Sequence, residues 1–347
     1  MVWLAWRAGY FPTGHRTDTT ALLTNAPAPV VHQEPPLVST TLVTRAVLPD
    51  PTTNVAGPPS NSPVPASVVL AAQIALDRMA FSPGSIDGVL GAQTRAALHA
   101  FQERELLPQT GQLDTLTRAR LALDAPALID YRVAGADLAR LRPIASTWLG
   151  KSMQERLDYE TLLELVAERS HAHPNLIRKL NPAVDWITAV PGTELIVPAT
   201  RRDPPRAKAA TIQIRLRDRA LDVFDAGNHL IAHFPCSIAA RVEKRPVGKL
   251  RVAVMAPNPD YTFNPELFPE APEARDPGTK LKLPPGPNNP VGTAWIGLDR
   301  PGYGIHGTPR PEEVGRTESH GCFRLANWNA EYLLQVVTVG TPVEVEP

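Results

Sequence analysis

The chain carries the tetrapeptide IHGT at residues 305–308 and the heptapeptide SHGCFRL at residues 319–325. In the second stretch Cys322 follows a glycine, which lets the backbone turn tightly, and precedes an apolar residue. His306 lies sixteen positions earlier, so the two side chains can meet if they lie on neighbouring strands or on a strand and its return loop. An adjacent imidazolium lowers the pKa of a thiol. The sequence therefore predicts a reactive thiolate with a histidine base.

The residues around these motifs have the pattern of a mainly β domain over 210–347. Apolar and polar residues alternate from 212 to 217, the period of a half-buried strand. Further strands are expected at 220–224, 229–237, 249–254, 293–298, 304–306 and 341–345, with a helix over 327–336. Segment 256–290, rich in Pro, Asn and Asp, is long for a connection in a compact domain, which is typical of a lid or binding loop.

Length and composition limit what the rest of the chain can be. At 347 residues two or three domains are expected, and the net charge of zero argues against nucleic acid as the main partner. The ten prolines between residues 26 and 65 predict that 1–66 is an extended tether. Two cysteines are too few for a disulfide framework or a cysteine-rich zinc module, and no apolar run is long enough for a transmembrane helix.

Residues 67–124 have the pattern of a small helical bundle. The run from Gly84 to Thr94 contains Ile86-Asp87-Gly88, and the run from Ala97 to Gln102 continues as a helix. These two runs resemble the type-1 peptidoglycan-binding domain. The alternative from the residues alone is a generic bundle in which Asp87 and Gly88 serve only as turn and cap residues.

Residues 125–200 predict a second small unit. Helices are expected at 162–167 and from Pro174, and a turn and closing strand at 190–198. Its Asn-Pro and Pro-Gly-Thr-x-Leu-x-Val-Pro parts resemble a LysM module, a βααβ fold that binds glycans. The sequence LDYET at 157–161 stands where such modules carry Gly-Asp-Thr, so a structural spacer is an equal alternative.

The whole of 210–346, and above all the Cys/His motifs, resembles a YkuD-type L,D-transpeptidase catalytic domain. The expected fold class is therefore multidomain α+β, with a helical bundle, a LysM-like module and a sandwich-like, mainly β catalytic domain. The resemblance implies L,D-transpeptidation of peptidoglycan, with Cys322 as nucleophile, His306 as base and the Gly307 carbonyl orienting the imidazole. Asn329, where many relatives have Asp, is expected to affect helix capping.

The remaining candidate site residues are assigned to the oxyanion and the substrate. The amides of Gly321 and Cys322 are placed to stabilise the oxyanion. His320 is expected to shape or polarise the loop that also contains Ser319. Arg324 either holds a substrate carboxylate or pins the loop, and Tyr303 either lines the donor site or packs on its strand.

Several alternatives remain open from the sequence alone. No cofactor is expected, and a zinc site made of His306, His320 and Cys322 lacks a fourth ligand and a regular spacing. The acyl acceptor could be water, which would make the protein an L,D-carboxypeptidase, or the domain could be an inactive wall-binding scaffold. Cys236, in an apolar strand, is expected to be a buried small hydrophobe rather than a disulfide partner.

The resemblance also implies where the protein acts and what it meets. We expect a monomer in the periplasm or cell wall, with peptidoglycan stem peptides and glycan strands as partners and carbapenem-type β-lactams as inhibitors. The apolar run VWLAW at residues 2–6 comes before Arg7 and lacks the basic start and longer apolar core of a secretory signal, so the sequence does not show the export route.

Overall fold

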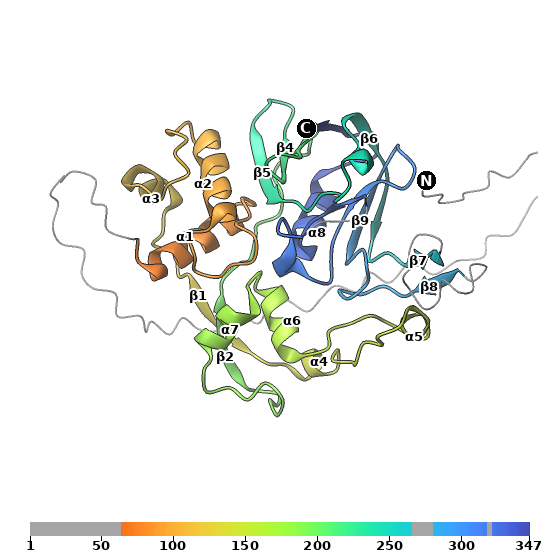
Figure 1. Cartoon of the computed structure of the whole chain (residues 1–347). Coiled ribbons are helices and arrows are strands. Elements are labelled where there is room, and N and C mark those ends of the chain that lie inside the picture. Colours follow the sequence, from red (N-terminus) through yellow and green to blue (C-terminus); the bar gives the residue numbers. More distant parts are fainter. Residues whose placement is uncertain (1–63, 266–279, 318–320) are drawn as a thin grey trace, which may run out of the picture. The chain divides into compact units, whose positions relative to one another are not determined.

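The computed structural model describes residues 64–265, 280–317 and 321–347. Most of the expected tether therefore lies outside the described residues, as do Ser319 and His320. The described part is α+β, as predicted, with helices leading and a mixed sheet following (Figure 1). None of its helices has the length and apolar character needed to span a bilayer.

The first three helices form the bundle expected from the sequence: α1 (Ala66–Arg78), α2 (Ala92–Arg104) and α3 (Thr115–Leu121). The turn at Asp87 and Gly88 is held by the buried amide of Gln73. The Oε1 of Gln73 accepts from the Gly88 N–H at 2.7 Å, and its Nε2 donates to Asp87 Oδ1 at 2.9 Å. Helix α2 has Gly91 as its N-cap without a side-chain cap, so Asp87 shapes the turn and does not cap the helix.

The next group of elements contains two antiparallel strands and four short helices: β1 (Leu128–Arg132), α4 (Gly135–Leu138), α5 (Trp148–Ser152), α6 (Leu162–Arg169), α7 (Pro174–Leu180) and β2 (Glu194–Pro198). The two helices and the closing strand predicted from sequence are confirmed. The unit begins with strand β1. In the segment 157–161, Thr161 is the N-cap of α6, where its hydroxyl accepts from the Glu164 N–H at 3.1 Å. The LysM assignment stays a prediction.

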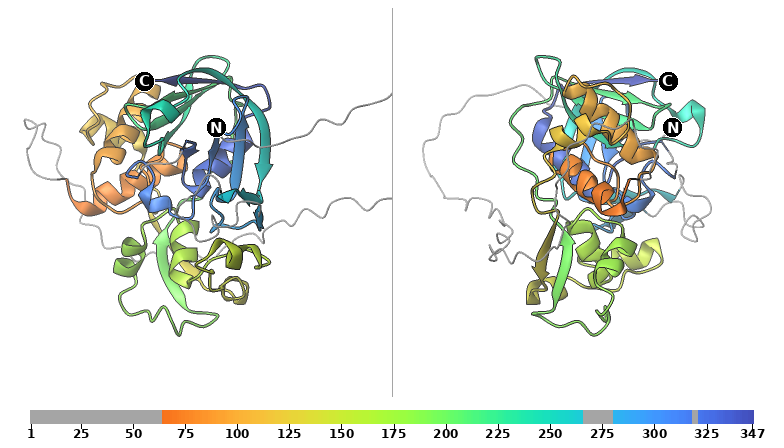
Figure 2. Two further views of the ribbon diagram at one scale, coloured as in Figure 1. Left: turned by 45° about the vertical axis from the view of Figure 1, so that its right-hand side comes forward. Right: turned by 90° about the vertical axis from the view of Figure 1, so that its left-hand side faces the viewer.

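Eight of the remaining strands build one mixed sheet in the order β11-β10-β9-β6-β12-β3-β4-β5. Its members are β3 (Thr211–Arg215), β4 (Ala220–Phe224), β5 (Leu230–Pro235), β6 (Gly248–Pro257), β9 (Ala294–Leu298), β10 (Gly304–His306), β11 (Phe323–Arg324) and β12 (Pro342–Glu346). Helix α8 (Asn327–Val336) packs on the sheet through Ala330, Leu333 and Val336, which belong to its core (Figure 2). The predicted strand and helix positions are confirmed; the two-residue β11 is an addition.

The expected sandwich is instead a single sheet that curls until its two edges meet. Strand β6 joins the halves, because residues 248–251 pair with β12 and residues 252–257 pair with β9. Ser237, just after β5, bridges Arg324 in β11 through two hydrogen bonds, N–H to O at 2.9 and 3.0 Å. The edge that carries the cysteine motif is therefore tied to the opposite edge of the sheet.

The long segment 256–290 contains a small hairpin of β7 (Tyr261–Phe263) and β8 (Leu281–Leu283). The aromatic ring of Trp148, from α5, stacks on Phe263 with a centroid distance of 4.4 Å and lies 6.2 Å from Tyr261. The described part of the expected lid is therefore packed against the module that contains α5.

A buried junction involves side chains from all three parts of the described chain. Arg202 donates to Asp77 Oδ1 at 2.6 Å and to Asn329 Oδ1 at 2.8 Å. Asn329 also donates to Ser82 Oγ at 3.0 Å, whereas Ala326 is the N-cap of α8 and gives no side-chain cap. The expectation that Asn329 affects helix capping was therefore wrong. His171 also belongs to the junction, with its Nδ1 2.7 Å from Asp77 Oδ2.

Candidate active site

The two sequence motifs meet through strands β10 and β11, which run parallel with Ile305 opposite Phe323 and His306 opposite Arg324. Side chains alternate between the two faces of a strand. Ile305 and Phe323, 0% and 1% exposed, belong to the core, so His306 and Arg324 lie on the other face. Cys322 is two positions before Arg324 and comes to that same face. The pairing therefore gathers the proposed nucleophile and base at one edge of the sheet.

His306 is held in one orientation by its own neighbour in the chain. Its Nδ1 lies 2.6 Å from the carbonyl oxygen of Gly307, which can only accept, so the proton is on Nδ1 and Nε2 is the nitrogen able to take another. Burial lowers the pKa of His306 to about 4, and the nearby Arg324 charge adds to this, against the Gly307 hydrogen bond. The imidazole is therefore neutral at pH 7, as a general base must be.

Cys322 is a neutral thiol in the resting protein. Burial raises the pKa of Cys322 to about 11, although a hydrogen bond from the Gly304 backbone and the Arg324 charge both act to lower it. Its Sγ lies 3.5 Å from the carbonyl oxygen of Gly302. The resting thiolate predicted from the Cys/His spacing is therefore wrong. The spacing does not show how strongly burial penalises both charged forms.

Two further side chains act on the thiol electrostatically. Arg324 is half-buried, and burial lowers its pKa, whereas Glu313, Cys322 and Cys236 act to raise it. Burial raises the pKa of Tyr261 to about 12, and a negative Cys322 would raise it further. Tyr261 was not predicted to be a site residue, because only the folding of β7 toward β10 and β11 brings it to the cysteine.

Trp295 is a second residue that the sequence analysis missed. It lies opposite His306 on β9, and the two rings stack with a centroid distance of 5.6 Å. A Cβ at Gly304 would lie 2.6 Å from the indole Cη2, and a Cβ at Gly297 would lie 2.9 Å from its Nε1. Two glycines in neighbouring strands thus leave room for the ring that covers His306. The sequence offered one signal for this role, because Gly297 lies in the same predicted strand as Trp295 and Gly304 in the next one, and both leave its ring room.

The other predicted residues have separate surroundings. Tyr303 packs against the core with the Arg300 guanidinium 4.8 Å from its ring centroid, so its contacts favour the packing alternative. A Cβ at Gly321 would meet no described atom within 4 Å. Cys236 is fully buried, and burial raises its pKa to about 12, which confirms it as a core residue. Both cysteines are thiols.

No group of three His, Cys, Asp or Glu side chains suited to a metal occurs within residues 64–265, 280–317 and 321–347; His320 lies outside these ranges.

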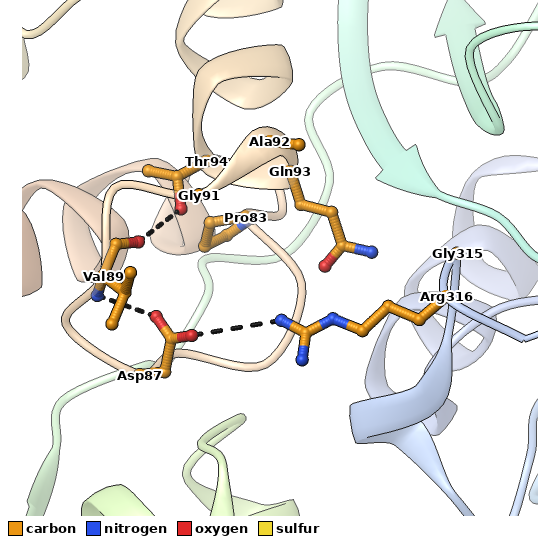
Figure 3. Close-up of a pocket in the computed structure, with 9 residues that line it drawn as sticks. All are labelled: Pro83, Asp87, Val89, Gly91, Ala92, Gln93, Thr94, Gly315 and Arg316. Atoms are coloured by element: carbon orange, nitrogen blue, oxygen red, sulfur yellow. Dashed lines mark hydrogen bonds and ion pairs between the residues drawn. The ribbon is translucent and has the colours of Figure 1, made fainter.

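A hollow of about 160 Å³ lies at the start of α2 (Figure 3). Asp87 and Gln93 line it from the helical bundle, and Arg316 from the loop between His306 and Cys322. Gln93 Nε2 donates to the Val314 carbonyl at 2.6 Å, so this loop is attached to the bundle.

Comparison with known families gives two matches. Residues 209–345 match the L,D-transpeptidase catalytic domain, and residues 66–121 match a putative peptidoglycan binding domain. These ranges contain His306 with Cys322 and the Asp87 turn, respectively. The resemblances to the L,D-transpeptidase catalytic domain and to the type-1 peptidoglycan-binding domain are therefore supported, and the LysM-like module stays a prediction.

Individual relatives are similar over parts of their length. The putative L,D-transpeptidase YkuD of Bacillus licheniformis is 24% identical over 188 residues, which are 54% of this chain and 94% of the relative. The putative L,D-transpeptidase YqjB of Bacillus subtilis is 38% identical over 104 residues, 28% of this chain and 49% of the relative. The probable L,D-transpeptidase YbiS of Escherichia coli K12 is 28% identical over 165 residues, 47% and 53%. The chain thus spans most of the first relative and about half of the others.

A solved structure, an L,D-transpeptidase from Xylanimonas cellulosilytica, is also similar. It has 15% sequence identity and a TM-score of 0.34, and the match covers 80% of this chain and 92% of that one.

Proposed function

We propose that this protein cross-links or modifies peptidoglycan stem peptides through a thioester on Cys322, because residues 209–345 match the L,D-transpeptidase catalytic domain. The observation that carries the proposal is the parallel pairing of β10 and β11, which brings His306 and Cys322 to one face of the sheet. The match of residues 66–121 to a peptidoglycan binding domain supports a polymeric wall substrate. The site of action would then be the periplasm or cell wall, and the active form a monomer.

The reaction begins from two neutral groups. As the sulfur of Cys322 attacks the donor carbonyl, the thiol proton passes to Nε2 of His306, whose Nδ1–H stays on the Gly307 carbonyl. Backbone N–H groups at Gly321 and Cys322 would stabilise the oxyanion, typically by about 3 kcal/mol for one donor. When the C–N bond breaks, the leaving D-alanine amine takes the proton from His306 and a thioester remains.

The second half reverses the roles of the same groups. The amine of an acceptor stem attacks the thioester carbonyl and gives a proton to His306, which returns it to the sulfur as the C–S bond breaks. Arg324, half-buried beside the thiol, is suited to a substrate carboxylate. Ser319 and His320 would complete the loop, and no cofactor takes part in any step.

The direct test is mass spectrometry of muropeptides after incubation with the purified chain. We expect the wild type to form cross-linked products with loss of D-alanine. Cys322→Ala should form none, whereas Cys236→Ala, which changes only a core side chain, should stay near the wild-type rate. Products from Cys322→Ala would contradict the mechanism, and products trimmed of D-alanine but not cross-linked would indicate that water is the acceptor.

Carbapenems give a second arm of the same test, because their strained β-lactam carbonyl resembles the acyl donor. Intact-mass measurement should show one adduct on the wild type, slow labelling of His306→Ala and none on Cys322→Ala. A persistent adduct on Cys322→Ala would mean that another residue is the nucleophile.

A further inference from the structure

The side-chain amide of Asn327, the first residue of α8, contacts the backbone next to the proposed base His306. It is 1% exposed, and its Oδ1 accepts hydrogen bonds from the Thr308 N–H at 2.9 Å and the Thr293 N–H at 3.3 Å. Thr308 follows Gly307, whose carbonyl fixes the His306 ring. The Asn327 amide therefore holds the backbone that orients the imidazole.

Glycine is required where this amide enters the turn. A Cβ at Gly307 would lie 2.1 Å from Asn327 Oδ1, and a Cβ at Gly292 would lie 2.0 Å from the same atom. Gly292 also has a φ of +62°, which a side chain disfavours. Two glycines thus leave space for a single carbonyl oxygen, so the position of that oxygen is closely defined.

The other end of the amide is held from outside the catalytic domain. Asn327 Nδ2 donates to Glu168 Oε1 at 3.0 Å and to the Pro287 carbonyl at 3.4 Å. Glu168 lies in the last turn of α6, in the module at 125–200. It is half-buried, and Tyr159 of the same module donates to its Oε1 at 3.4 Å.

We propose that Glu168 is a positioning residue for the transferase reaction, which holds the Asn327 amide and, through it, the Gly307 carbonyl and His306. The proposal rests on the proposed function only in that His306 serves as the base for Cys322. It gives the module at 125–200 a role in the chemistry, whether or not that module binds glycan.

The acid group of Glu168 has charged neighbours that make this contact sensitive to pH. Burial, together with the charges of Glu331 of α8 and Glu164 of α6, raises the pKa of Glu168 to about 8 against the hydrogen bonds from Asn327 and Tyr159. The carboxyl is therefore mostly protonated at pH 7 and still offers an acceptor oxygen to Asn327. Ionisation above pH 8 adds a negative charge beside Glu164 and Glu331.

The test uses alkylation of Cys322 by iodoacetamide at pH 7, which reports on the Cys/His geometry without any peptidoglycan. Glu168→Ala removes the acceptor, and we expect it to slow labelling by up to about 100-fold, as for a reacting group misplaced by 1 Å. Glu168→Gln keeps an acceptor oxygen and should label near the wild-type rate. Glu155→Ala, the loss of an exposed acid from the same module, is the matched control.

A double-mutant cycle with His306→Ala separates positioning from a general loss of stability. If Glu168 acts through His306, then Glu168→Ala with His306→Ala labels no more slowly than His306→Ala alone. Fully additive losses, or wild-type labelling of Glu168→Ala, would overturn the proposal.

The pH profile adds a readout that does not require Glu168→Ala to fold. When the rate of Cys322 labelling is plotted against pH, the slope should change near pH 8 for the wild type and not for Glu168→Gln. Identical profiles for the two proteins would contradict the proposal.

Failure of the proposed function gives a different result. A chain that shows the coupling of Glu168 to His306 but makes no muropeptide product would support the positioning role and contradict transpeptidation.

Discussion

The Cys322 thiol and the His306 imidazole are both neutral groups at pH 7. Their pKa values of about 11 and about 4 are both set mainly by burial, which penalises the thiolate and the imidazolium alike. A resting ion pair is therefore disfavoured, and in the proposed reaction the thiol proton moves as the sulfur attacks. A half-buried thiol that stays neutral at pH 7 is less prone to oxidation than a thiolate.

The pH dependence of alkylation follows from these values. Iodoacetamide reacts with the thiolate, and without His306 the thiolate of Cys322 forms only when the thiol loses its proton to solvent. Below the thiol pKa we therefore expect labelling of Cys322 in His306→Ala to rise roughly tenfold per pH unit from pH 7 toward about 11. Measuring iodoacetamide incorporation by mass spectrometry between pH 6 and 10 checks this, with Cys322→Ala as the blank. A plateau below pH 8 would contradict a raised thiol pKa.

The β7–β8 hairpin shows how one element depends on another module. The hairpin shares a small core with α5 and with Leu157, and the Trp148 ring covers its inner face. The chain after β8 is also attached, because the Leu157 N–H donates to the Pro285 carbonyl at 3.0 Å. A Cβ at Gly286 would lie 2.1 Å from the Leu157 carbonyl oxygen, so the two segments are in close backbone contact. This contact holds Tyr261 near the thiol.

Trp148→Ala should therefore loosen the hairpin without changing the sheet. Losing two aromatic contacts costs about 1 kcal/mol each beyond the buried area. We expect faster hydrogen exchange at 261–263, unchanged exchange in β3 and β4, and a KM that rises more than kcat falls. Met153→Ala, at a position 77% exposed in the residue after α5, is the control. Hydrogen exchange at 261–263 that stays as slow in Trp148→Ala as in the wild type would show that the Trp148 ring does not hold the hairpin.

The Arg202 junction joins the three parts of the described chain. Although burial alone would raise the pKa of Asp77, the Arg202 guanidinium and His171 hold it below its usual value. The Asp77 side chain is 0% exposed, and that of Arg202 is 8% exposed. His171 also stacks on Trp328 at 4.9 Å. A buried charge pair of this kind couples the helical bundle, the 125–200 module and the catalytic domain.

Breaking that pair leaves Asp77 buried without its main counter-charge, which typically costs about 3–5 kcal/mol. We expect Arg202→Ala to lower the unfolding midpoint in urea and to split a single transition into at least two, as the modules uncouple. Arg201→Ala removes an exposed neighbour and should leave the wild-type curve. One unshifted transition for Arg202→Ala would show that the junction does not couple the modules.

Strand positions and the meeting of the His306 and Cys322 motifs could be predicted because alternation and motif spacing are local properties of the sequence. The helix over 327–336 was predicted for the same reason and matches α8. Trp295, Tyr261 and Glu168 were missed because each reaches the site only through packing between elements far apart in the chain. The pKa of Cys322 was predicted in the wrong direction, since burial is a property of the folded chain.

The bridge between Ser237 and Arg324 has a consequence for how the protein folds. Its two residues are far apart in sequence, and such non-local contacts slow folding because a long loop must close. Strand β11, which directly follows Cys322, is therefore completed only when the two edges of the sheet join. A polypeptide threaded across a membrane in an unfolded form would cross without an assembled Cys322–His306 site and would acquire its reactivity at its destination.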